Sequence, residues 1–207
     1  MKSDLIKEII ELGLFKVSSS ADKNKWILLK NGSRTPVFLD TAKFISYPEL
    51  IAKVNKFAVK IIKDNNIIFD RIIGAPYGGL PFCYGIANIL QAPCLALRKE
   101  GPKNYSTAGE LLGIYKKGER VLLIEDATVT ANTVIEFVKK LRSQGLRVTD
   151  VITILDIEKF AKTNLDKHQI RLHSLFTWKD LFGYYKIKNS RLISAKMRIF
   201  LDNFINN

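Results

Sequence analysis

The sequence predicts an α/β fold in which helices flank a parallel sheet. From residue 70 onward, short apolar runs alternate with segments of helical periodicity, and these segments favour crossover helices between parallel strands. Runs this apolar are typical of strands that are buried on both faces. The expected strands cover residues 71–74, 94–97, 121–124 and 148–155, and the expected helices cover 80–90 and 134–142.

The chain before residue 70 follows a different pattern. Apolar residues at helical spacing predict an amphipathic helix over residues 3–13, which Gly13 ends. Residues 26–29 and 36–40 are expected to form two strands across a turn, and a proline-led helix is expected over residues 48–63. At the other end of the chain, the expected elements are a strand over 172–176 and a helix over 190–205.

A long polar loop over residues 98–118 interrupts the alternation of strands and helices. It is rich in glycine and lysine, with Gly101-Pro102 near its start and Lys116-Lys117 near its end. Connections of this length are uncommon inside a compact domain and often serve as lids or binding loops. We therefore expect a binding loop here, with a plain surface excursion as the alternative.

Two adjacent acids, Glu125 and Asp126, are expected to end the strand over residues 121–124. A threonine-rich run, residues 127–133, separates them from the next helix. Carboxylates at this position can bind ribose hydroxyls or a metal, and amides beside a helix N-terminus can hold a phosphate. The glycine-rich turn 75–81 and the loop that starts at Arg98 follow other strands, so the three segments should meet at one edge of the sheet. The alternative is an ordinary connection with solvated acids.

Composition and charge narrow the classes of partner. The net charge of +13 attracts anions, but the cations are scattered and lack an aromatic stacking platform, so nucleic acid is not an expected partner. No apolar run approaches the length of a membrane span, and the N-terminus does not have the pattern of a signal peptide. Cys83 and Cys94 lie in apolar surroundings and are expected to be reduced thiols in the cytoplasm.

The order of these motifs resembles the orotate phosphoribosyltransferases, particularly the form fused to a decarboxylase in UMP synthases. The matching residues, in chain order, are Leu29-Lys30-Asn31-Gly32-Ser33, Pro36, Asp40, Ile45-Ser46-Tyr47-Pro48, Pro76-Tyr77, Leu80-Pro81, Arg98-Lys99-Glu100, Lys103, Tyr105, Glu125-Asp126 and Arg171-Leu172-His173-Ser174. The resemblance runs over nearly the whole chain and implies a type I phosphoribosyltransferase fold. It implies a single phosphoribosyltransferase domain over residues 1–207, with a hood over about residues 1–45 and a lid loop at 98–118.

The activity implied by the resemblance is transfer of ribose 5-phosphate from phosphoribosyl pyrophosphate (PRPP) to orotate. The products would be orotidine 5′-monophosphate and pyrophosphate, in pyrimidine biosynthesis. The resemblance also implies Mg²⁺ as cofactor, a homodimer whose lid reaches the neighbouring site, and an orotidine monophosphate decarboxylase as partner. The alternatives are a phosphoribosyltransferase for another base and a non-catalytic member of the fold that binds nucleotides or RNA.

The family's functional residues match particular positions of this sequence. The implied catalytic residues are Lys103 and Asp126. The implied PRPP contacts are Tyr77, Arg98, Lys99, Lys103, Tyr105, Glu125, Asp126, Ala127, Thr128, Val129, Thr130, Ala131, Asn132 and Thr133. The implied orotate contacts are Lys30, Phe38 and Leu39, and Glu125 and Asp126 are implied to hold the metal directly or through the substrate.

The sequence departs from the family pattern in the phosphate loop, the base pocket and the lid. Without a gap, Ala131 takes the place of a loop glycine, and a left-handed backbone there would cost about 1 kcal/mol. A shift of one residue would instead place Asn132, which tolerates that backbone, and both registers stay open. Ile157 stands where the family usually has an arginine that contacts the pyrimidine, and Gly101-Pro102 lengthens the lid before Lys103.

Overall fold

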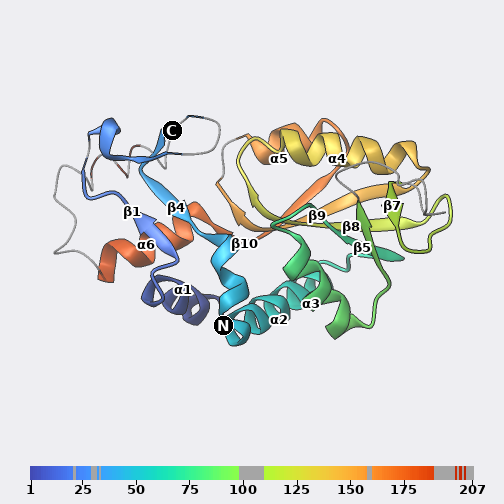
Figure 1. Ribbon diagram of the computed structural model, residues 1–207, viewed down its shortest axis with the longest axis horizontal. Coiled ribbons are helices and arrows are strands. Elements are labelled where there is room, and N and C mark those ends of the chain that lie inside the picture. The colour runs from blue at the N-terminus through green and yellow to red at the C-terminus, as the bar shows by residue number, and fades with distance from the viewer. Residues whose placement is uncertain are drawn as a thin grey trace. The chain divides into compact units, whose positions relative to one another are not determined.

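The computed structural model of the protein describes residues 1–20, 22–28, 32, 34–97, 110–157, 160–188, 199, 201 and 203. The chain divides into a smaller unit, residues 1–50 with 176–207, and a larger unit, residues 51–175 (Figure 1). Within the described residues, no helix has the length and apolar character that a membrane span requires.

A six-stranded sheet with the strand order β10-β9-β8-β5-β6-β7 forms the centre of the larger unit. The strands are β5 (Arg71–Gly74), β6 (Cys94–Leu97), β7 (Leu111–Leu112), β8 (Arg120–Thr128), β9 (Arg147–Asp156) and β10 (Arg171–Thr177). β5 pairs in parallel with β6 and β8, β8 pairs in parallel with β9, and the short β7 pairs antiparallel with β6. The predicted α/β fold class with a mostly parallel sheet is confirmed.

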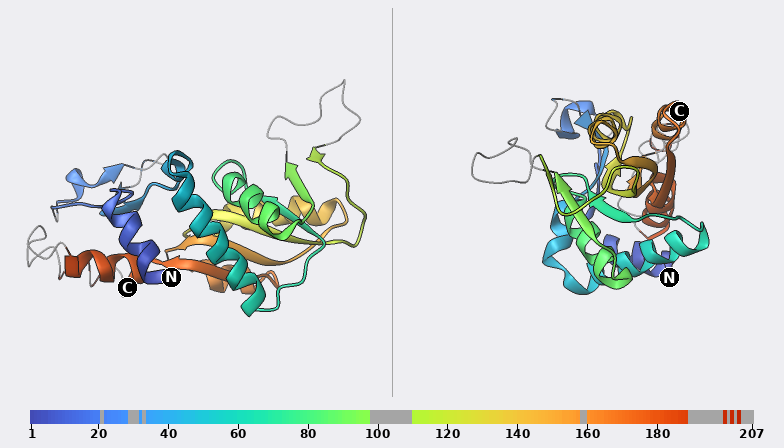
Figure 2. Two further views of the ribbon diagram at one scale, coloured as in Figure 1. Left: turned by 90° about the horizontal axis from the view of Figure 1, so that it is seen from below. Right: turned by 90° about the vertical axis from the view of Figure 1, so that its right-hand side faces the viewer.

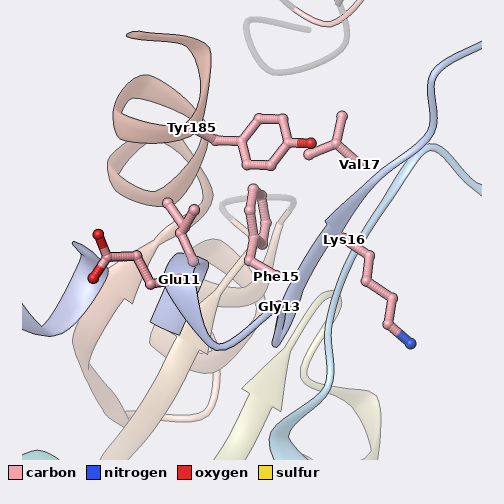
Figure 3. A pocket seen from close by; sticks show the side chains of 7 residues that line it. Glu11, Gly13, Phe15, Lys16, Val17 and Tyr185 are labelled. Atoms are coloured by element: carbon pink, nitrogen blue, oxygen red, sulfur yellow. The ribbon is translucent and has the colours of Figure 1, made fainter. Parts of the chain in front are cut away.

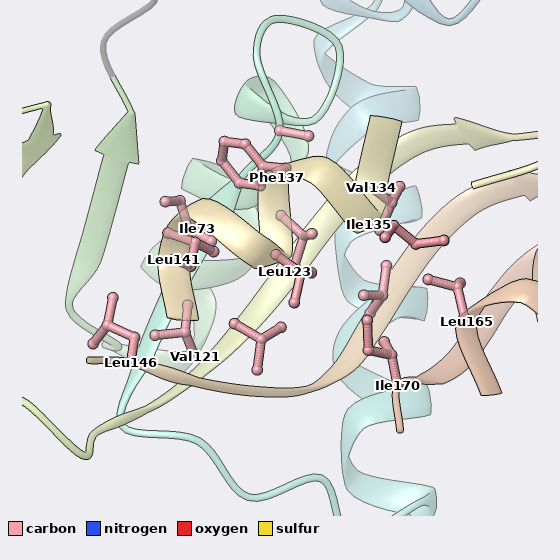
Figure 4. Packing of buried hydrophobic residues seen from close by; sticks show 14 of the residues in the cluster. Ile73, Val121, Leu123, Val134, Ile135, Phe137, Leu141, Leu146, Leu165 and Ile170 are labelled. Carbon is pink, nitrogen blue, oxygen red and sulfur yellow. The ribbon is translucent and has the colours of Figure 1, made fainter. Parts of the chain in front are cut away.

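Helices cover both faces of this sheet (Figures 1 and 2). They are α2 (Pro48–Asp64), α3 (Leu80–Leu90), α4 (Asn132–Ser143) and α5 (Ala161–Asp166). α4 turns Val134, Val138 and Leu141 toward the sheet, where they pack with Ile73 and Leu123 in a buried cluster (Figure 4). This spacing of apolar residues along α4 is the reason the sequence forms a helix here and buries one face of it.

Two expectations about the strand ends and loops of the larger unit were wrong. The acids Glu125 and Asp126 do not end their strand, because β8 continues to Thr128. Its extension is held by parallel pairing with β9, in which Glu125 lies opposite Thr153. The loop predicted over residues 98–118 contains the strand β7, which pairs with β6, and α5 was not predicted.

The smaller unit consists of short elements. They are α1 (Lys2–Glu11), β1 (Phe15–Val17), β2 (Ile27–Leu28), β3 (Arg34–Thr35), β4 (Val37–Leu39), α6 (Trp178–Lys188) and two 3-10 turns, Lys23–Lys25 and Thr41–Ser46. Phe15 holds β1 to α6 through edge-on ring contacts, with centroid distances of 5.5 Å to Trp178 and 5.7 Å to Tyr185. Gly13, with φ +67°, follows α1 as expected.

The predicted pairing of the two N-terminal strands was wrong. β2 pairs with β3, whereas β4 pairs antiparallel with β1, which was not predicted. Pro36 lies between β3 and β4 and has no N–H group to donate to a ladder, so the extended segment is interrupted there and its two halves pair with different strands. Its carbonyl oxygen instead accepts a hydrogen bond from the Ser18 amide at 2.6 Å. The predicted helix over residues 190–205 lies largely outside the described residues, and α6 was not predicted.

Candidate functional site

The paired acids lie in the second half of β8, toward the carboxyl edge of the sheet. Glu125 is 8% exposed, and its burial, together with the neighbouring Asp126 carboxyl, raises its pKa to about 9. Asp126 is half-buried, its amide donates to Glu125 Oε1 at 3.0 Å, and its own Oδ1 accepts from the Ala127 amide at 2.9 Å. At neutral pH the pair therefore combines a protonated Glu125 with the Asp126 side chain beside it.

The glycine-rich turn between β5 and α3 lies directly against these acids. A Cβ atom on Gly78 would overlap the Asp126 carboxylate, and one on Gly79 would overlap the carbonyl oxygen of Ile124. The Ala75 amide donates to the same Ile124 oxygen at 2.8 Å. Tyr77, which a cis peptide bond joins to Pro76, is 64% exposed. It directly precedes Gly78, the residue that lies against Asp126. The turn and β8 thus meet as predicted. Gly78 is part of this contact, and in the sequence only the Gly78-Gly79 pair pointed to it.

The phosphate loop, residues 127–133, leads from β8 into α4. Ala131 has φ 61° and ψ 13°, a left-handed backbone, and Asn132 is the first residue of α4. The structure thus favours the ungapped register, in which Ala131 takes the left-handed position. Asn132 does not take it. Ala131 is only 5% exposed and belongs to the cluster beneath α4, so its methyl group gains from burial what the backbone loses in strain.

The loop amides are open to an anion. In the part of the chain that the structure describes, the backbone amides of residues 129–134 donate no hydrogen bond. The Thr130, Asn132 and Thr133 side chains are exposed, as is Val129 at 45%. Thr128 is 1% exposed and its hydroxyl lies 3.5 Å from the Leu155 oxygen, so it faces the sheet. Free amides beside the positive end of α4 form an arrangement that suits a phosphate.

The remaining predicted residues fall elsewhere. Phe38 is half-buried and Leu39 is 4% exposed, both on β4 of the smaller unit. Ile157 is half-buried just after β9, and its amide donates to the Thr128 oxygen at 2.9 Å. The predicted residues that lie outside the described ranges are Lys30, Arg98, Lys99, Lys103 and Tyr105.

The smaller unit has a separate pocket of about 440 Å³ (Figure 3). It is lined by Ile10, Glu11, Gly13, Phe15, Lys16, Val17 and Tyr185. None of the predicted site residues lines it. Among the residues that the structure describes, no group of three or more histidine, cysteine, aspartate or glutamate side chains could hold a metal ion.

Comparisons with known proteins agree on one family. The model of the phosphoribosyl transferase domain matches residues 43–185. The chain is 31% identical over 171 residues to an orotate phosphoribosyltransferase of Caenorhabditis elegans, covering 83% of this chain and 75% of that protein. It is 31% identical over 180 residues to that of Methanocaldococcus jannaschii, covering 87% and 96%. Among solved structures, the UMP synthase of Leishmania donovani matches with a TM-score of 0.79 at 26% identity, over 99% of this chain but 42% of that one.

Proposed function

Because the chain belongs to the orotate phosphoribosyltransferase family, we propose that it transfers ribose 5-phosphate from PRPP to orotate. The products are orotidine 5′-monophosphate and pyrophosphate, a step of pyrimidine biosynthesis. The observation that carries the proposal is the meeting of Asp126, the Gly78 turn and the free amides of the phosphate loop at one edge of the sheet.

In this reaction the bond from ribose C1 to the pyrophosphate oxygen breaks, and a bond from C1 to a nitrogen of orotate forms as that nitrogen loses its proton. Positive charge grows on the ribose and negative charge on pyrophosphate. The Asp126 carboxylate accepts hydrogen bonds from the ribose hydroxyls and stabilises the developing cation. The loop amides and the N-terminus of α4 hold the 5-phosphate, and the turn at Tyr77 contacts the pyrophosphate. The site therefore separates the two anionic ends of PRPP.

The carboxyl groups also suit Mg²⁺. Proteins usually bind this ion through one or two carboxylates together with waters and substrate phosphates, so a larger protein cluster is not required. Asp126 would hold the ion, directly or through the ribose hydroxyls. Glu125 can join only after losing its proton, because its raised pKa keeps it neutral in the metal-free protein. Bound Mg²⁺ would neutralise charge on the departing pyrophosphate.

The family resemblance supports further parts of the proposal. Arg98, Lys99 and Lys103 on the lid stabilise the leaving group, with Lys103 acting in the neighbouring subunit of a homodimer. Lys30 pairs with the acidic pyrimidine, and Phe38 supplies an apolar wall beside Leu39. The likeness to UMP synthases supports a decarboxylase partner that consumes the product. A cytoplasmic location agrees with the free thiols of Cys83 and Cys94.

A pyrophosphate-release assay tests the proposal. Purified protein is supplied with PRPP, Mg²⁺ and a panel of bases, and turnover with orotate alone is expected. A second candidate is transfer to a different base, which Ile157 favours because its side chain has no donor for a pyrimidine oxygen. Turnover with another base would support that candidate. PRPP binding without turnover would instead indicate a non-catalytic member of the family.

A further inference from the structure

Helix α5 makes a direct contact with the phosphate loop. The side-chain amide of Asn164 donates a hydrogen bond from Nδ2 to the backbone oxygen of Thr130, with a length of 3.0 Å. The two residues are 34 positions apart in the chain. Asn164 is half-buried and does not belong to the site residues assigned above.

Other carbonyl groups of the loop are also held by hydrogen bonds. The Thr128 oxygen accepts from the Ile157 amide at 2.9 Å, and the Ala131 oxygen accepts from the Ile135 amide at 2.9 Å. In a trans peptide, a carbonyl group and the following N–H group point in opposite directions. Holding the Thr130 oxygen toward α5 therefore directs the Ala131 amide to the opposite side, where it is free to meet an anion.

Buried residues of α5 fix the helix that carries Asn164. Its residues Ala161 and Leu165 are 1% and 0% exposed and belong to the same buried cluster as Ala131. The Asn164 amide also donates to the Phe160 oxygen at 2.9 Å, within the first turn of the helix. The loop and α5 thus share one buried cluster, and the Asn164 side-chain hydrogen bond joins them directly.

We propose that Asn164 is a positioning residue, which holds the Thr130 carbonyl so that the Ala131 amide faces the 5-phosphate of PRPP. This inference rests on the proposed function. Asn164 itself does not contact the substrate. Loss of the Asn164 side chain leaves the acids and the glycine turn in place and disturbs only the loop that binds the 5-phosphate. The effect should therefore fall on PRPP binding.

The test compares Asn164→Ala with a matched control, Asn65→Ala. Asn65 is exposed, and its Nδ2 atom also donates to a backbone oxygen, that of Ile61 at 2.9 Å, but it lies at the end of α2. For Asn164→Ala we expect the KM for PRPP to rise about three- to tenfold, as for loss of one neutral hydrogen bond. The KM for orotate and kcat should stay within about twofold, and the control should match wild type in all three constants. An unchanged KM for PRPP in Asn164→Ala would overturn the proposal.

Hydrogen–deuterium exchange separates this inference from the proposed function. In protein without ligand, the Ile135 amide, which donates to the Ala131 oxygen, should exchange faster in Asn164→Ala than in wild type or Asn65→Ala. If wild type turns over no base, the proposed function fails, and the exchange rates still decide whether Asn164 orders the loop. If wild type is active and the Ile135 amide exchanges at the same rate in all three proteins, Asn164 has no positioning role.

Discussion

The Asp126 carboxylate lies against the backbone of Gly78, so closely that a methyl group on residue 78 would overlap it. The turn after β5 and the acids of β8 therefore fit together only when residue 78 has no side chain. The overlapping atoms are the far end of the Asp126 side chain, which can rotate away. A larger residue at position 78 would thus displace the carboxylate without unfolding the protein.

Gly78→Ala is expected to remove activity while preserving the fold. Moving a functional carboxylate by about 1 Å can lower turnover about 10²-fold. Steady-state kinetics with PRPP and orotate should show this loss, and the melting temperature should change little. Gly183→Ala is the control. Gly183 lies in α6, and a methyl group there would meet no atom within 4 Å. Full activity in Gly78→Ala would show that the position of Asp126 is not critical.

Asp126→Asn tests the charge of the same side chain. The substitution keeps the volume but removes the anion that we propose binds Mg²⁺ and the ribose hydroxyls. Calorimetry is expected to show that Mg²⁺-dependent affinity for PRPP falls by about tenfold or more, as for loss of a charge-assisted hydrogen bond. Asp166→Asn, an exposed change at the end of α5, should leave affinity unaltered. Equal PRPP affinity in wild type and Asp126→Asn, with and without Mg²⁺, would count against the donor site.

The central strands were predictable because their apolar runs are long enough to specify burial. β5 and β6 have the bounds that the sequence predicts. The extent of β8 was not predictable, since acidic residues are poor strand formers and only pairing with β9 keeps Glu125 and Asp126 in the ladder. The short strands of the smaller unit were not predictable either. β1 has only three residues, too few for a local pattern, and it is a strand because it pairs with β4.

The candidate site was predictable where chemistry follows from adjacent residues, as at Glu125 and Asp126. The register of the loop was not, because an alanine disfavours the left-handed backbone that Ala131 adopts. Burial of the Ala131 methyl group in the tertiary structure is what places this residue, and not Asn132, at the left-handed position. The hydrogen bond from Asn164 to Thr130 was likewise invisible, since nothing in the local sequence relates two residues so far apart.

Ala131→Gly tests this account of the loop. The change relieves about 1 kcal/mol of left-handed strain, but it removes a buried methyl group of about 0.8 kcal/mol and adds freedom to the unfolded chain. The free energy of unfolding in urea should therefore change by less than about 1 kcal/mol. Ala161→Gly removes a methyl group from the same cluster without relieving any left-handed strain, and should destabilise by about 1–2 kcal/mol. Equal losses in both variants would contradict the account.

Asp150 makes the stability of the larger unit depend on acid pH. It lies on β9 with its side chain 4% exposed, and it contacts Arg171 at 2.9 Å and His173 Nε2 at 2.8 Å. Burial alone would raise its pKa, but hydrogen bonds with His173, Arg171 and Thr149 outweigh burial and lower the pKa from 3.8 to about 2. A lowered pKa means that the folded protein binds the Asp150 proton less readily than the unfolded chain does.

The stability that Asp150 contributes, about 2 kcal/mol, is therefore present above pH 4 and is lost as the pH falls toward 2. Asp150→Asn removes this dependence. Urea unfolding of wild type and Asp150→Asn at pH 5 and pH 3 should show that the advantage of wild type shrinks by about 1 kcal/mol on acidification. Asp166→Asn corrects for the general loss of negative charge, and its difference from wild type should stay nearly constant. A difference between wild type and Asp150→Asn that does not change over this range would mean that the carboxylate has no stabilising partners in solution.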